Sequence, residues 1–152
     1  MALKKILCPT DFSPGAREAL QVAVRMAIES SATLVLVHVW DMSAWAISEL
    51  TVAPAALQEL IDWTEAELGR WKRDVLAMGV REVQARSESG VPWERIAAVC
   101  NQDAGIGLVV MGTHGRTGLR HALLGSVAER VVRHAPCSVM VVRDRVDHRD
   151  VA

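Results

Sequence analysis

The residues Leu108-Val109-Val110-Met111-Gly112-Thr113-His114-Gly115-Arg116-Thr117-Gly118 place a short apolar run directly before a glycine-rich segment. Such a run is typical of a strand buried on both faces of a parallel sheet. After Leu124-Gly125-Ser126, residues 127–134 have the pattern of an amphipathic helix. The glycines therefore lie at the carboxyl end of a strand, where open α/β sheets bind their ligands.

Each residue type in this segment suits a phosphate group. Glycine lets the backbone approach a ligand closely, and Ser126 offers a hydroxyl and an N-cap to a helix whose free N–H groups attract an anion. Four glycines and two arginines, Arg116 and Arg120, lie between residues 112 and 125. The alternative is a glycine-rich turn that only joins strand to helix. The coincidence of these residues favours a phosphate-binding loop.

The better-known phosphate motifs do not fit the chain. No G-x-x-x-x-G-K-[ST] motif occurs in the sequence, and Gly105-x-Gly107 precedes a strand instead of opening a helix. The spacing Gly112-x2-Gly115-x9-Gly125-Ser126 is therefore neither a P-loop nor a dinucleotide fingerprint.

The rest of the chain alternates strands with helices. Strands are expected over residues 3–8, 34–40, 83–87, 108–111 and 137–142, and helices from Pro14, over 55–78, from Pro92 and over 127–134. In the first helix, which Ser13 caps, Leu20, Val24, Ala27 and Ile28 should face the sheet. This order predicts an α/β fold, a single doubly wound domain with a five-stranded parallel sheet. We expect residues 1–143 to form the domain and 144–152 to be a charged C-terminal tail.

Composition limits the classes of partner. The 17 basic and 18 acidic residues give a formal charge of −1, which offers no general attraction to nucleic acid or to an anionic membrane. No signal peptide or membrane span is visible. The three cysteines show no C-x-x-C spacing, and buried reduced thiols are expected. These features predict a cytoplasmic location.

Three segments together resemble the universal stress protein family. They are Ile6-Leu7-Cys8-Pro9-Thr10-Asp11-Phe12-Ser13, the glycine spacing above, and His134-Ala135-Pro136-Cys137-Ser138-Val139-Met140-Val141-Val142. The chain is identified as a member of the UspA-like family in its ATP-binding branch. The resemblance implies a Rossmann-like, adenine nucleotide alpha hydrolase-like fold, with ATP as the ligand.

The resemblance also implies which residues form the site. Adenine and ribose would lie against Pro9, Thr10, Asp11 and Val39, with Asp11 as a hydrogen-bond acceptor. Ribose and triphosphate would follow Met111, Gly112, Thr113, His114, Gly115 and Arg116, and then Gly125, Ser126 and Val127. The nucleotide's own phosphates could carry Mg²⁺. Taken alone, Asp11 also fits a turn or helix-cap residue, and His114 also fits a solvated loop residue.

Catalytic residues are not expected. Ser126, His114 and Asp11 invite comparison with a hydrolase triad, but the chain lacks a G-x-S-x-G elbow. The five histidines have no spacing typical of a metal site. The sequence therefore favours a nucleotide-dependent switch or sensor of the stress response, with a slow ATPase as one alternative.

The other alternative is a nucleotide-independent interaction protein that works as a dimer. Family members commonly dimerise through the last strand, and Val139, Met140, Val141 and Val142 form an apolar edge suited to that role. A homodimer is expected in either case. The apolar segment 41–54, which has no clean periodicity, is either packed on its own domain or part of a lid or partner surface.

Overall fold

The computed structural model of the protein describes residues 3–41, 54–113 and 124–143. In chain order the elements are β1 (Lys5–Pro9), α1 (Pro14–Ser30), β2 (Thr33–Asp41), α3 (Pro54–Ala77), β3 (Val83–Gly90), α4 (Pro92–Gln102), β4 (Ile106–Gly112), α5 (Ser126–His134) and β5 (Ser138–Val142). The apolar segment 41–54 and the tail 144–152 lie almost wholly outside the described residues.

The five strands form one parallel sheet in the order β3-β2-β1-β4-β5. This confirms the α/β fold with a five-stranded parallel sheet. The chain moves outward from β1 to β3, returns to the other side of β1 as β4, and ends at β5. The strand order therefore reverses between β1 and β4, and ligands of such sheets bind beside the carboxyl ends at that point.

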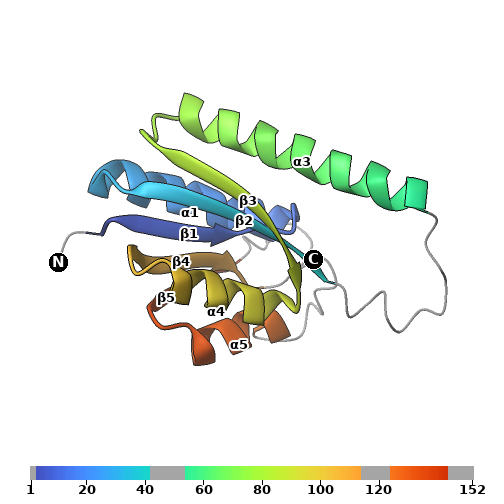
Figure 1. Ribbon diagram of the computed structural model, residues 1–152. Coiled ribbons are helices and arrows are strands. Elements are labelled where there is room, and N and C mark those ends of the chain that lie inside the picture. Colours follow the sequence, from blue (N-terminus) through green and yellow to red (C-terminus); the bar gives the residue numbers. More distant parts are fainter. Residues whose placement is uncertain (1–2, 42–53, 114–123, 144–152) are drawn as a thin grey trace, which may run out of the picture.

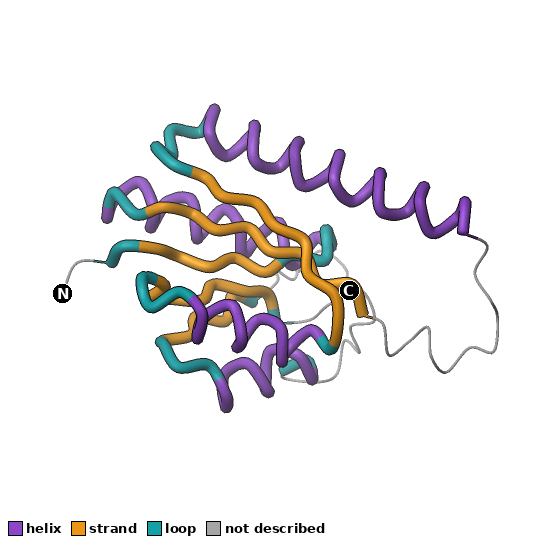
Figure 2. Tube along the Cα trace, viewed as in Figure 1, coloured by secondary structure: helices purple, strands orange, loops and turns teal. Residues whose placement is uncertain are grey.

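Helices cover both faces of the sheet (Figure 1). One face packs against α1 and α3, and the other against α4 and α5. All four strand pairs are parallel, so the carboxyl ends of β1 and β4 lie at the same end of the sheet. Figure 2 shows the strands side by side between the helices. Within the described ranges, no helix has the length and apolar character needed to cross a membrane.

The central strands are buried on both faces. Side chains of β1 alternate between the two cores, and Ile6, Leu7 and Cys8 are all fully buried. This explains why these strands are continuous apolar runs. The edge strand β3 differs, because Val83 is its one fully buried residue and most of its other side chains are exposed.

The start of α1 and the end of α3 follow local sequence signals, whereas one residue expected to face the sheet does not. Ser13 caps α1 as expected, and its Oγ accepts a hydrogen bond from the Ala16 N–H at 3.2 Å. Gly79, at a φ of 104°, follows the end of α3. The expectation that Ile28 faces the sheet is wrong, because its side chain is 44% exposed. Ile28 lies in the last turn of α1, beside Gly79 and not over the central strands.

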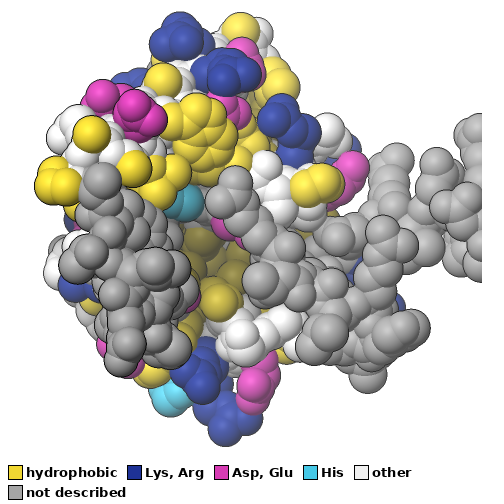
Figure 3. Space-filling model, turned by 90° about the vertical axis from the view of Figure 1, so that its right-hand side faces the viewer, with side chains coloured by type: hydrophobic (Ala, Val, Ile, Leu, Met, Phe, Trp, Pro, Cys, Tyr) yellow, Lys and Arg dark blue, Asp and Glu magenta, His cyan; other side chains and the backbone are white. Residues whose placement is uncertain are grey.

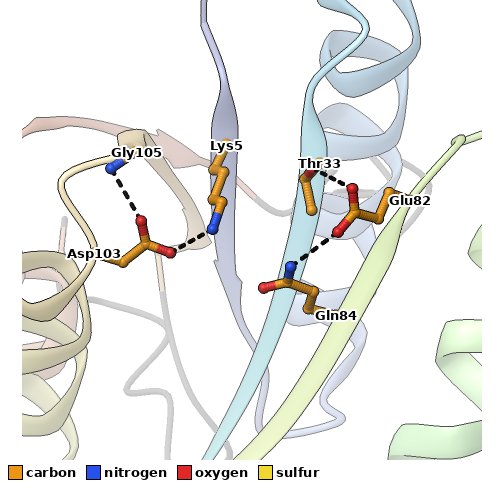
Figure 4. A network of polar contacts seen from close by, with 6 residues as sticks. All are labelled: Lys5, Thr33, Glu82, Gln84, Asp103 and Gly105. Atoms are coloured by element: carbon orange, nitrogen blue, oxygen red, sulfur yellow. Dashed lines mark hydrogen bonds and ion pairs between the residues drawn. The ribbon is translucent and has the colours of Figure 1, made fainter.

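A polar network lies around the amino ends of the strands (Figure 4). The Lys5 ammonium donates to Asp103 Oδ2 at 2.7 Å, and Asp103 Oδ1 accepts from the Gly105 N–H at 3.0 Å. The hydrogen bond from Lys5 is the main cause that holds the pKa of Asp103 below its ordinary value of 3.8. The pair thus joins β1 to the segment between α4 and β4.

We predict that Asp103→Asn lowers the free energy of unfolding at pH 7 by at most about 1 kcal/mol, because an ion pair this exposed is weak. The side chains of Lys5 and Asp103 are 28% and 32% exposed. A carboxylate with a lowered pKa stabilises the fold above its unfolded pKa, and the effect is lost as the pH falls through the folded pKa. The difference between wild type and variant should therefore shrink below about pH 3.8.

Urea unfolding at a series of pH values measures this difference. The matched control is Lys5→Met, alone and combined with Asp103→Asn. If the two residues form a stabilising pair, the combined variant should lose less stability than the sum of the two single losses. A difference that stays constant below pH 3.8 would show that the ion pair is not its source.

Candidate functional site

The chain after β1 folds into a tight turn before α1 begins. The Thr10 N–H donates to the Val37 carbonyl of β2 at 2.8 Å, and Thr10 Oγ1 accepts from the Phe12 N–H at 2.9 Å. Asp11 Oδ1 accepts from the Ser13 N–H at 3.0 Å. Asp11 thus has the turn role that the sequence allowed, and this role holds its carboxylate at the carboxyl end of β1.

Phe12 has an unusual backbone in this turn. Its φ of 63° lies in the left-handed region, which costs a non-glycine residue about 1–3 kcal/mol. Its ring stacks on His38 with centroids 4.9 Å apart, and meets the edges of Trp63 and Trp71 at 5.5 Å. These aromatic contacts hold the strained turn in place.

The carboxyl end of β4 packs closely against the start of α1. A Cβ added to Gly112 would lie 3.0 Å from the backbone carbon and oxygen of Gly15. Backbone atoms cannot give way as a flexible side chain can. Gly112 is therefore required for packing, in addition to any contact with a ligand.

A hydrogen bond brings the two ends of the glycine-rich segment together. The Gly125 N–H donates to the Thr113 carbonyl at 2.7 Å, and the Thr113 N–H donates to the Val142 carbonyl at 3.0 Å. The expectation that Ser126 caps α5 is wrong: Gly125 is the N-cap and Ser126 is the first helical residue. The bond to Thr113 holds Gly125 outside the helix, and its ψ of 156° is extended.

The floor of the site is hydrophobic. Val39, Met111, Leu124, Val127 and Trp93 all belong to the core cluster beneath α4 and α5. Figure 3 looks onto the carboxyl ends of the strands, where the surface is hollowed near its centre and hydrophobic side chains line the visible floor. An apolar floor next to a polar turn and a helix N-terminus suits a ligand with a flat ring and an anionic group.

The structure brings most of the predicted site residues to this end of the sheet. Those that lie at the ends of β1, β2 and β4 or at the start of α5 are Pro9, Thr10, Asp11, Val39, Met111, Gly112, Thr113, Gly125, Ser126 and Val127. The predicted residues His114, Gly115 and Arg116 lie outside the described residues. The comparison of Ser126, His114 and Asp11 with a triad therefore rests on sequence alone.

Sequence reasoning missed three residues beside the site. His38 donates to the Thr10 carbonyl, Phe12 packs on His38, and the buried Trp93 Nε1 has no hydrogen-bond partner. His38 directly precedes Val39, so strand alternation places it on the opposite face of the sheet from Val39. Adjacency to the predicted residues Asp11 and Val39 was the one available signal for Phe12 and His38.

The described residues contain no reactive thiol at this end and no group of three or more metal-ligating side chains. All three cysteines are free thiols. Burial raises the pKa of Cys8, next to the turn, to about 12, and burial is also the main cause that raises the pKa of Cys100 to about 12. Both therefore remain protonated at neutral pH.

Comparison with known proteins gives a consistent family. The sequence model of the universal stress protein family matches residues 2–143. A universal stress protein of Methanocaldococcus jannaschii is 36% identical over 141 residues, which cover 92% of this chain and 82% of that protein. The structure of the universal stress protein UspA from Lactobacillus plantarum has a TM-score of 0.79 at 27% identity and covers 94% of this chain and 99% of that one.

Two more distant structures share the fold and contain adenine nucleotides. A universal stress protein in complex with cAMP has a TM-score of 0.69 at 22% identity, and covers 94% of this chain and 98% of that one. The universal stress protein from Archaeoglobus fulgidus in complex with dAMP has a TM-score of 0.61 at 17% identity, and covers 93% of this chain and 98% of that one.

We predict that Gly112→Ala destabilises the fold by about 1–3 kcal/mol, because the added methyl group meets the Gly15 backbone at 3.0 Å. Gly69→Ala is the matched control. Gly69 lies inside α3, and a Cβ there would meet Arg73 Nη1 at an ordinary 3.5 Å. Gly69→Ala should stabilise the protein by up to about 1 kcal/mol. Urea unfolding measures the stability of both variants. Equal stability of wild type and Gly112→Ala would contradict the packing role of Gly112.

Proposed function

The chain belongs to the universal stress protein family, and from this premise we propose that it binds ATP in the crevice between β1 and β4 and acts as a nucleotide-dependent switch in a stress response. The hydrogen bond from the Gly125 N–H to the Thr113 carbonyl is the observation that carries the proposal. It places the first turn of α5 beside the carboxyl end of β4. A ligand there meets the helix N-terminus and the β1 turn together.

The base and ribose would occupy the β1 side. Val39, Met111 and Val127 supply an apolar surface, and the turn of Thr10 and Asp11 supplies polar groups. A flat base gains from the apolar floor, and a carboxylate such as Asp11 can accept hydrogen bonds from amino or hydroxyl groups. These roles follow the family pattern and fit the local chemistry.

The phosphates would occupy the α5 side. The N–H groups in the first turn of a helix have no acceptor within that helix, and the helix dipole favours an anion. Ser126 and Val127 therefore offer N–H groups, and Ser126 adds a hydroxyl. The Gly125 N–H already donates to Thr113, so glycine at 125 would serve for close approach and not as a donor. His114, Gly115 and Arg116 would complete the phosphate site, as the family resemblance implies.

The proposal also covers Mg²⁺, the cellular location and the bounds of the domain. With no metal-ligating cluster among the described side chains, Mg²⁺ would be held chiefly by the nucleotide's phosphates. Free thiols at all three cysteines support a cytoplasmic location. We also propose that residues 1–143 form the domain and that the charged tail 144–152 is dispensable for folding.

The first experiment is to identify nucleotide released from freshly purified protein by mass, and then to titrate the stripped protein with ATP and AMP. Bound adenine nucleotide and tighter binding of ATP would support a switch that recognises the outer phosphates. Release of inorganic phosphate from added ATP would instead favour a slow ATPase. A protein that is empty and refuses both nucleotides would contradict the proposal.

We predict that Gly125→Val weakens ATP binding at least about tenfold, a loss of about 1.4 kcal/mol, because its side chain occupies the phosphate side of the crevice. The fold should survive, since φ of −70° and ψ of 156° at Gly125 are accessible to any residue. Titration calorimetry measures the affinity, with Gly69→Ala as the control that keeps wild-type binding. Equal affinity of wild type and Gly125→Val would remove the proposed phosphate site.

The second candidate function is a nucleotide-independent interaction protein that works through a dimer. β5 is the last strand of the sheet, and its outer edge pairs with no other strand in the part of the chain that the structure describes. Met140 on β5 and Val132 on α5 are exposed large hydrophobic side chains on this side of the molecule. An apolar strand edge of this kind favours pairing with a second copy.

We predict that the protein is a dimer and that Met140→Asp converts it into a monomer, because the new charge would be buried in the interface. The matched control is Met78→Asp. Met78 is also an exposed methionine, at 54% against 37% for Met140, but it follows α3 and lies away from β5. Light scattering after gel filtration gives the mass. A wild-type monomer, or a Met140→Asp dimer, would exclude β5 as the interface.

A further inference from the structure

We propose that His38 is a positioning residue for the nucleotide site: its ring holds the Thr10 carbonyl and so keeps the β1 turn apart from Val39. The inference rests on the proposed nucleotide site and names a residue that controls its geometry. His38 Nδ1 lies 2.8 Å from the Thr10 carbonyl oxygen. A carbonyl can only accept a hydrogen bond, so Nδ1 carries the proton and donates it.

The position of this bond in the sheet gives it a role beyond stability. The paired register of β1 with β2 ends at Pro9 and Val37, and the Thr10 N–H then donates to the Val37 carbonyl. In a continuing parallel ladder, the Thr10 carbonyl would accept next from the Val39 N–H. It accepts from the His38 side chain instead.

The imidazole therefore takes the place of a ladder hydrogen bond. It satisfies the Thr10 carbonyl while the chain leaves the sheet, and the strands separate at the point where the proposed crevice begins. Without the imidazole, the Thr10 carbonyl and the Val39 N–H could pair as the ladder pattern dictates. The two halves of the proposed base site would then close on each other.

Aromatic neighbours fix the direction of the ring. Phe12 stacks on His38 at 4.9 Å with an interplanar angle of 26°, and Trp40 meets it edge-on at 5.3 Å. Trp40 is itself held by a hydrogen bond of 2.7 Å from its Nε1 to Ser87 Oγ of β3. The left-handed backbone of Phe12 is what brings its ring back over β2. Nδ1 is thus directed at the Thr10 carbonyl before any ligand arrives.

Three substitutions of His38 distinguish the effect of its hydrogen bond from the effect of its side-chain size. In His38→Asn the amide nitrogen can take the place of Nδ1, in His38→Gln it lies one bond farther out, and His38→Leu has no donor. We expect adenine nucleotide affinity to fall about five- to tenfold in the Leu and Gln variants, as for one lost hydrogen bond. The Asn variant should stay within about twofold of wild type. The ratio of ATP to AMP affinity should not change, because the phosphate side is untouched.

A second measurement uses the protein without nucleotide. Hydrogen exchange by NMR should show the Val39 amide more protected in His38→Leu than in wild type and His38→Asn, because the ladder has closed. A merely structural role of the ring would lower global stability in all three variants and leave the Val39 amide no better protected.

The results distinguish a failure of the proposed nucleotide binding from a failure of the proposed role of His38. A wild-type protein that binds neither ATP nor AMP overturns the proposed function and, with it, the role of His38. A wild-type protein that binds nucleotide, together with a His38→Leu variant of equal affinity or an unprotected Val39 amide, overturns the His38 proposal alone. Weakened binding and a protected Val39 amide in His38→Leu, both restored in His38→Asn, support it.

Discussion

The contact between the backbones of Gly112 and Gly15 determines how near the start of α1 lies to the end of β4. Because no side chain stands between them, the start of α1 and the carboxyl end of β4 are in close backbone contact. This close approach lies beside the point of strand reversal between β1 and β4, where open α/β sheets bind their ligands.

The polar groups around this contact are largely satisfied within the chain. Asp11 accepts from Ser13, Ser13 caps α1, and Thr113 bonds to both Gly125 and Val142. Each bond fixes the described residues that it joins, which would lower the ordering cost for a ligand at the proposed site. The strain of Phe12 belongs to the same arrangement, since a left-handed backbone at this residue brings its ring onto His38.

The sequence predicted the fold well because its signals are local. Apolar runs in β1, β2 and β4 follow from burial on both faces, and Ser13 with Pro14 marks the start of α1 by side-chain chemistry alone. Ile28 was mispredicted because periodicity identifies a helix face but not where the sheet beneath it ends. Ser126 was mispredicted as a cap because residue preference favoured serine, whereas the bond from Gly125 to Thr113 moves the helix start by one residue. His38 and its acceptor Thr10 are 28 residues apart, and no spacing rule connects them.

The two sides of the proposed nucleotide site would differ in what builds them, and a short sequence pattern can indicate only one of them. The proposed phosphate side would consist mainly of backbone N–H groups at the start of α5, so its sequence requirement is a short pattern of glycines without side chains. The base side would depend on side chains from separate strands and helices, such as Val39 on β2 and Val127 on α5, that meet only after folding. A glycine pattern therefore indicates that an anion can bind. Which base would accompany that anion depends on tertiary contacts, which no short pattern in the sequence records.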